Sequence, residues 1–145
     1  MKKVEVIIDI QSRPERIIEA FTDPVMLRSW WDVERTLIEK RNGGLYTLAW
    51  DITDKGFGFV STGIIKKYIP KSVLEIDNFI YLNPGVSILG PMKLTVYAKD
   101  KNGGAELYLC QDGYQTGRDW DWYYEAVQHA WPLVVKKLKE FLEKK

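Results

Sequence analysis

The sequence is poor in the residues on which most catalytic and metal sites depend. It contains a single cysteine, Cys110, and a single histidine, His129. One cysteine cannot form an internal disulfide, and one cysteine with one histidine does not supply a usual zinc ligand set. A hydrolytic triad would have to use His129, for which no nucleophile and no orienting partner can be identified. We therefore expect no metal and no cofactor, assign no catalytic residue, and favour a non-enzymatic role.

The sequence also lacks an excess of charge of one sign and a long hydrophobic run. Its 21 Lys and Arg residues are balanced by 20 Asp and Glu residues, which leaves a net charge of +1. This balance predicts no nucleic-acid partner and no attraction to an anionic membrane surface. The apolar residues near the N-terminus are interrupted by Glu5 and Asp9, so they predict neither a secretory signal nor insertion into a membrane. We expect a cytoplasmic protein that folds as a single domain over residues 1–145.

Aromatic residues, by contrast, are abundant. They make up 13% of the chain and include six tryptophans. This is more large, flat surface than a domain of 145 residues needs in order to close its core. The surplus indicates a place where aromatic side chains contact a bound partner.

The pattern of apolar residues predicts an α+β domain. Alternating apolar residues over residues 4–10 are typical of a strand with one buried face. Pro14 and Pro24 then stand near the start of two short helical segments. A series of strands separated by turns follows as far as Gln111. From Arg118 onward the apolar residues recur at spacings of three and four, which predicts one long amphipathic helix.

Three segments of the chain are similar to those of a known family. Residues 17–31, IIEAFTDPVMLRSWW, contain the Thr-Asp-Pro and Trp-Trp elements of that family's N-terminal helical region. The glycine pair that precedes Tyr46 is similar too, as is the C-terminal run from Trp131, although Ala130 stands where glycine commonly precedes this tryptophan. The chain thus resembles the START and birch-pollen-allergen-like helix-grip superfamily (SRPBCC). Within it, the chain is most similar to the branch of the C-terminal domain of the activator of heat shock protein 90 ATPase.

The resemblance implies a helix-grip fold. In this fold a curved antiparallel sheet of about seven strands carries two short helices after its first strand and a long C-terminal helix across its concave face. Side chains fill the space between helix and sheet incompletely, so a cavity is expected there. Alternation along the strands and periodicity along the helix select the residues that would line it. The candidate ligand-binding residues are Trp30, Tyr46, Trp50, Phe59, Asn78, Gln111, Trp120, Tyr124 and Trp131.

Two of these candidates carry side-chain amides. Asn78 and Gln111 occupy predicted inward positions on otherwise apolar strands. An amide on such a face costs about 1–3 kcal/mol unless it is paired. Each is therefore expected either to bond a neighbouring side chain or to receive a polar group of the ligand. Trp30, together with Trp31, is expected at one rim of the cavity.

Three functions are compatible with these expectations. The first is non-enzymatic binding of an apolar or aromatic small molecule in a cavity between the C-terminal helix and the sheet. The second, implied only by the resemblance, is a chaperone-cofactor-like interaction domain whose partner is a chaperone or another protein. The third is a polyketide-cyclase-like enzyme that uses the same cavity, against which stands the lack of a convincing acid and base pair. We favour the first, because the aromatic surplus supports it.

Overall fold

The computed structural model describes residues 2–144 of the chain. It contains seven strands and three helices in the order expected from the sequence. The elements are β1 (Lys3–Ile10), α1 (Pro14–Ala20), α2 (Pro24–Trp31), β2 (Arg35–Ile38), β3 (Leu45–Trp50), β4 (Phe59–Ile69), β5 (Val73–Leu82), β6 (Leu89–Lys101), β7 (Gly104–Asp112) and α3 (Arg118–Glu143).

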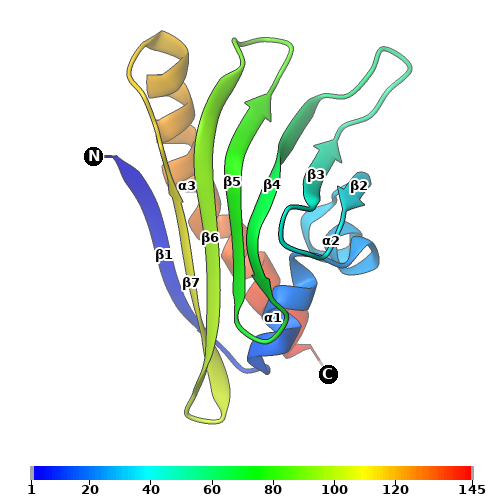
Figure 1. Ribbon diagram of the computed structural model, residues 1–145, viewed down its shortest axis with the longest axis vertical. Helices are drawn as coiled ribbons and strands as arrows, with labels where there is room; N and C mark the ends of the chain where they lie inside the picture. Colours follow the sequence, from blue (N-terminus) through cyan, green and yellow to red (C-terminus); the bar gives the residue numbers. More distant parts are fainter. Residues whose placement is uncertain (1, 145) are drawn as a thin grey trace.

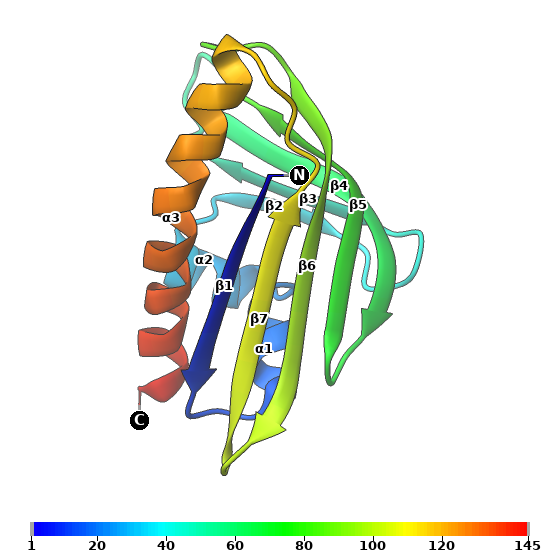
Figure 2. The same cartoon turned by 90° about the vertical axis from the view of Figure 1, so that its left-hand side faces the viewer.

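The strands form one antiparallel sheet in the order β1-β7-β6-β5-β4-β3-β2. β1 pairs with β7, so the first strand lies beside the last, and the remaining strands follow as a meander. The sheet is curved, and α3 runs along its concave side (Figures 1 and 2). α1 contacts α3 as well as β6 and β7, so it lies on the same side of the sheet as α3. This arrangement confirms the predicted α+β helix-grip fold.

The two short helices begin and end where the sequence restricts the backbone. Each starts with a proline, which fits the first turn because the N–H that it lacks would have no helical partner there. Asp23 precedes α2, and its carboxylate accepts a hydrogen bond from the N–H of Met26 at 2.9 Å. α2 ends at Trp31, and Asp32 follows in the left-handed conformation. These signals determine where Trp31 lies.

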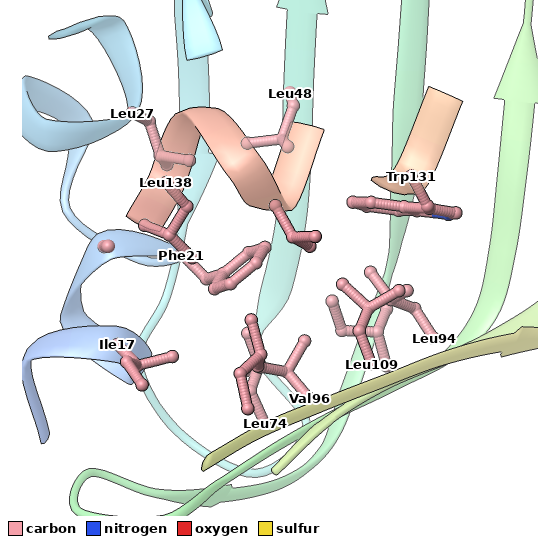
Figure 3. Packing of buried hydrophobic residues seen from close by; sticks show 14 of the residues in the cluster. Ile17, Phe21, Leu27, Leu48, Leu74, Leu94, Val96, Leu109, Trp131 and Leu138 are labelled. Carbon is pink, nitrogen blue, oxygen red and sulfur yellow. The ribbon is translucent and has the colours of Figure 1, made fainter. Parts of the chain in front are cut away.

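One end of the core is filled by aliphatic and phenyl side chains. Ile17 of α1 and Phe21, which follows this helix, gather there with Leu138 of α3 and with Leu74 and Val96 of the sheet (Figure 3). All five side chains are fully buried. Burial of a side chain of this size contributes about 1.5–3 kcal/mol to folding. α1 therefore fills the space between the C-terminal half of α3 and the sheet.

A bulge in β5 changes which side chains face inward. Pairing with β6 is irregular between Ile76 and Phe79, and Asn78 has a left-handed backbone there with φ of 51°. The irregularity shifts the alternation, so that Ile76 and Phe79 are both buried and Asn78 is exposed. The prediction that Asn78 faces the cavity is therefore wrong. Alternation assumes an unbroken register, and asparagine tolerates the left-handed conformation that breaks it.

α3 presents a different face to the sheet at its N-terminal end than predicted. The residues that it buries are Tyr123, Val127, Trp131, Val135, Leu138 and Leu142. Trp120 and Tyr124, expected to face the sheet, are half-buried and lie beside Tyr114, with ring centroids at 6.4 and 4.9 Å from its ring. Spacings of three and four residues fit both the predicted row, which begins with Trp120 and Tyr124, and the observed row, which begins with Tyr123 and Val127. Periodicity therefore does not determine the rotation of the helix about its axis. Like the other helices of the described chain, α3 lacks the apolar length that a membrane span requires.

Candidate functional site

A cavity of about 510 Å³ lies between the N-terminal half of α3 and the sheet. It is bounded by α3, by strands β3, β4, β5 and β7, and by the last residue of α2. Half of its lining residues are aromatic. The lining residues are Trp31, Asp32, Trp50, Asp51, Phe59, Ser61, Phe79, Tyr81, Gln111, Trp122, Tyr123, Ala126, Val127, Ala130, Trp131 and Val134.

Six of the aromatic side chains form a connected series, which we call the aromatic wall. In order of contact its members are Trp131, Trp31, Trp50, Phe59, Tyr81 and Tyr123. Consecutive ring centroids are 4.7 to 6.4 Å apart. Pairs of rings at such separations gain about 0.5–1.5 kcal/mol beyond the area that they bury. The closest pair, Tyr81 and Tyr123, links β5 to α3, so the wall holds helix and sheet together while it lines the cavity.

Gln111 of β7 joins the two ends of the aromatic wall. Its Oε1 accepts a hydrogen bond from the indole N–H of Trp131 at 2.8 Å, and its Nε2 donates to the hydroxyl of Tyr123 at 3.0 Å. Nε2 also donates to the sulfur of Met92 at 3.3 Å. Gln111 is only 1% exposed, where an unpaired amide would be costly. The amide of Gln111 is expected from the sequence either to bond a neighbouring side chain or to receive a polar group of the ligand, and the structure shows the first.

The hydroxyl of Tyr123 has a donor proton that is not used in a hydrogen bond within residues 2–144. Tyr123 is buried and lines the cavity. Burial raises the pKa of its phenol, so the hydroxyl keeps its proton across the physiological pH range. It accepts the hydrogen bond from Gln111 and donates to no atom of residues 2–144. Its proton is therefore available to an acceptor inside the cavity.

Trp30 and Tyr46 lie in the core and do not line the cavity. The indole N–H of Trp30 donates to the carbonyl of Ala20 at 2.9 Å, and the hydroxyl of Tyr46 donates to the carbonyl of Phe21 at 2.6 Å. Both side chains are buried. Trp30 also stacks on Trp31, with ring centroids 5.1 Å apart. Trp30 therefore supports the wall from the core side.

The structure brings four of the nine candidate residues into the cavity lining, namely Trp50, Phe59, Gln111 and Trp131. The other five lie elsewhere: Trp30 and Tyr46 in the core, Asn78 on the exposed surface, and Trp120 and Tyr124 beside Tyr114. Sequence reasoning missed Phe79, because of the bulge, and Tyr123, because of the rotation of α3. It also missed Tyr81, although this residue lies in a predicted strand and its aromatic type could have marked it.

Two carboxylates stand at the mouth of the cavity. Asp32 follows Trp31 at the end of α2, and Asp51 follows Trp50 at the end of β3. The indole N–H of Trp50 donates to the carbonyl of Trp31 at 3.0 Å, which joins these two segments. Both aspartates are exposed, and both have left-handed backbone conformations with φ of 57° and 53°. Trp122, which also lines the cavity, is 48% exposed. The cavity therefore opens to solvent beside Asp32, Asp51 and Trp122.

Other groups that could have carried chemistry do not line the cavity. The hydroxyl of Tyr108 donates to the carboxylate of Glu5 at 2.6 Å, and this bond lowers the pKa of Glu5. Burial raises the pKa of the Cys110 thiol, which disfavours the thiolate that a nucleophile needs. His129 is exposed on α3. Within residues 2–144, no group of three or more His, Cys, Asp or Glu side chains is arranged to hold a metal ion.

Several solved structures share the fold. The Aha1 dimer from Colwellia psychrerythraea is 16% identical with a TM-score of 0.74, and the alignment covers 99% of this chain and 97% of that one. Protein CV1439 from Chromobacterium violaceum is 19% identical with a TM-score of 0.75 and full coverage of both chains, 100% and 100%. CalU16 from Micromonospora echinospora is 15% identical with a TM-score of 0.67, covering 97% of this chain and 76% of that one. At these identities the likeness concerns the fold alone.

Sequence comparison gives the family. No curated protein sequence matches the chain. A family model described as "Activator of Hsp90 ATPase homolog 1-like protein" matches residues 11–143, which span α1 to the end of α3. The chain therefore belongs to the Activator of Hsp90 ATPase homolog 1-like family, a branch of the helix-grip superfamily that its sequence resembles.

Proposed function

We propose that this protein binds an apolar or aromatic small molecule, without catalysis, in the cavity between α3 and the sheet. The observation that carries the proposal is the aromatic wall, which together with Gln111 lines a space of about 510 Å³. Cavities of about 300–1,000 Å³ lined by apolar side chains, with a few polar groups to orient the ligand, are typical of small-molecule sites. The cavity has this size and this composition.

The contacts within the wall favour binding of a flat, apolar ligand. Its rings are held by one another and by two hydrogen bonds to Gln111, so they lose little side-chain freedom when a ligand enters. Each Å² of apolar surface that the ligand removes from water contributes about 25 cal/mol of favourable transfer free energy. The hydroxyl proton of Tyr123 can bond one oxygen or nitrogen atom of the ligand and thereby orient it.

Two measurements test the proposal on the intact chain. Native mass spectrometry of freshly purified protein should show a species heavier than the chain by the mass of a small molecule, which denaturation releases. Titration with the neutral probe 2-naphthalenemethanol should change tryptophan emission and saturate at one probe per chain. Four tryptophans line the cavity, so a bound naphthalene ring must lie near at least one of them.

A variant that fills the cavity provides the sharper test. Ala126 lines the cavity from α3, and Ala126→Trp adds an indole there without removing a core contact. Leu133→Trp is the matched control, because Leu133 lies on the same helix, is 65% exposed and does not line the cavity. We expect Ala126→Trp to abolish probe binding and Leu133→Trp to leave it unchanged. Unaltered binding by Ala126→Trp would place the probe elsewhere and contradict the proposal.

The family match favours a second candidate function. The family takes its description from an activator of the Hsp90 ATPase, so a chaperone-cofactor-like interaction domain is the alternative. It predicts that the chain raises the ATPase rate of an Hsp90 in a coupled assay. A stimulation that Ala126→Trp leaves intact would support a protein-interaction role independent of the cavity. We expect no stimulation.

A further inference from the structure

The charge distribution around the cavity bears on the chemistry of its ligand. Asp32 and Asp51 are the only acidic residues in its lining, and no Lys, Arg or His among residues 2–144 lines it. The remaining lining is aromatic or small, with Ser61 and Gln111 as the neutral polar members. The cavity thus offers negative charge at its mouth and no positive charge anywhere in its wall.

Neither carboxylate forms a close ion pair within the described part of the chain. Asp32 and Asp51 take part in none of the ion pairs within 4.0 Å that link other carboxylates to lysine or arginine side chains. Arg28 and Arg35 line a neighbouring pocket together with Asp32, and Arg28 donates to the backbone carbonyl of Glu34 at 3.0 Å. Neither arginine is among the residues that line the cavity itself.

The aromatic wall adds to this negative potential. The face of an aromatic ring carries partial negative charge, and a cation within about 6 Å of the ring centroid is attracted to it, most strongly by tryptophan. Trp31 and Trp50 precede the two aspartates and contact each other at a centroid distance of 5.1 Å. One face of Trp31 is covered by Trp30 and one face of Trp50 by Phe59, so each indole offers at most its other face to a ligand. Both indoles and both carboxylates line the cavity. An anionic ligand would meet repulsion from both kinds of group.

We propose that the ligand is an organic cation, whose ammonium or other positively charged group lies beside Asp32 and Asp51 and whose apolar body lies along the aromatic wall. This inference rests on the proposed function, because it names the chemical class of the molecule that the cavity binds. Cation–aromatic attraction and the carboxylates act at the mouth, whereas the hydroxyl of Tyr123 and the amide of Gln111 lie on the inner wall. A cationic headgroup on an aromatic body that carries one hydrogen-bond acceptor satisfies both regions.

Three probes with the same ring system separate charge from shape. They are (2-naphthylmethyl)trimethylammonium, 2-naphthalenemethanol and 2-naphthalenesulfonate, each titrated against the intact chain by tryptophan emission and calorimetry. We expect the cation to bind about tenfold more tightly than the neutral probe, and the sulfonate to bind more weakly than both. The preference should shrink when salt is raised from about 0.01 M to about 1 M, because exposed carboxylates are screened.

Substitution of the carboxylates locates the effect. Asp32→Asn and Asp51→Asn should each lower the affinity for the cation by about threefold, and the double variant should lower it further, with no change for the neutral probe. Asparagine tolerates the left-handed conformation at both positions, so the fold should be kept. Asp100→Asn is the control, since Asp100 is exposed near the β6–β7 hairpin, at the far end of the sheet (Figure 1).

The outcomes distinguish this inference from the proposed function. If the neutral probe binds in the cavity but the cation shows no preference, or if the sulfonate binds more tightly, the ligand is not a cation while the cavity still binds small molecules. A cation preference that persists in the double aspartate variant would also overturn the inference. If no probe of any charge binds, the proposed function fails and this inference fails with it.

Discussion

The two ends of the space between α3 and the sheet are filled in different ways. At the C-terminal end of α3, α1 contacts both α3 and the strands β6 and β7, and the side chains of Ile17 and of Phe21, just after α1, occupy the interior (Figures 2 and 3). At the N-terminal end the space is bordered by aromatic rings from α3 and the sheet and by the last residue of α2, and a cavity remains.

The difference follows from the shapes of the side chains. Branched aliphatic groups interdigitate at the density of an organic crystal, so an inserted helix with such side chains leaves little space. Aromatic rings are rigid and prefer edge-to-face or offset contacts, and they meet one another here across a curved sheet. The filled end, at the C-terminus of α3, therefore supplies stability, whereas the hollow end, at its N-terminus, provides a site.

The largest effect is expected at the filled end. Phe21 is fully buried beside Trp30, with ring centroids 5.4 Å apart. Phe21→Ala should lower the free energy of unfolding by about 3–5 kcal/mol, because it leaves a cavity in a close-packed region. Urea unfolding measures the change. Val25→Ala, at a position that is 73% exposed, serves as the control and should change stability by less than about 0.5 kcal/mol. Equal losses in the two variants would show that this end is not tightly packed.

At the hollow end, truncation of an aromatic side chain should lower stability less than Phe21→Ala does, but it should weaken ligand binding. Trp50 is larger than Phe21, but one side of its ring already borders the cavity, so Trp50→Ala removes fewer contacts for its size. We expect a smaller loss of unfolding free energy than for Phe21→Ala, together with loss of naphthalene-probe binding. A loss as large as that of Phe21→Ala, with no probe binding by the parent protein, would mean that the aromatic wall is ordinary core.

The hydrogen bonds of Gln111 provide a test of intermediate size. Gln111→Leu keeps a similar volume but leaves the buried indole N–H of Trp131 without its acceptor. The variant should lower the free energy of unfolding by about 1–3 kcal/mol. Gln115→Leu is the control, because Gln115 is exposed and its amide donates to the carbonyl of Gly90 at 3.5 Å. If Gln111→Leu unfolds at the parent's urea concentration, the amide does not hold α3 to β7.

The smallest effect concerns the loop that meets the N-terminus of α3. The carboxylate of Asp119 accepts hydrogen bonds from the N–H and the hydroxyl of Ser87 at 2.9 and 2.8 Å. Both bonds lower the pKa of Asp119 below its usual value of 3.8, and the bond from the backbone N–H has the larger effect. A depressed folded-state pKa contributes stability above the unfolded pKa, and that stability is lost as the pH falls through the folded value.

Asp119→Asn should therefore be less stable than the parent at neutral pH. The difference should shrink as the pH falls below 3.8 and disappear only below the lowered folded-state pKa. Unfolding by urea at a series of pH values measures it. A stability difference that stays constant across this pH range would mean that Ser87 does not stabilise the charged form of Asp119.

Local patterns in the sequence determined the fold class and part of the cavity. Alternation over β3 and β7 placed Trp50 and Gln111 inward, and helical spacing placed Trp131 on the inner face of α3. Prolines and Asp23 marked the short helices. These features depend on residues close together in the chain, so their physical causes, side-chain direction and capping, can be read from the sequence.

Only the tertiary structure decided the remainder. The bulge at Asn78 depends on how β5 pairs with β6, and the choice of Tyr123 over Trp120 and Tyr124 depends on how α3 rotates against the sheet. Asp32 and Asp51 are far apart in the sequence, and they meet at one mouth because α2 packs beside the end of β3. Register, helix rotation and the meeting of distant segments are set by the packing of the whole chain, which local periodicity does not contain.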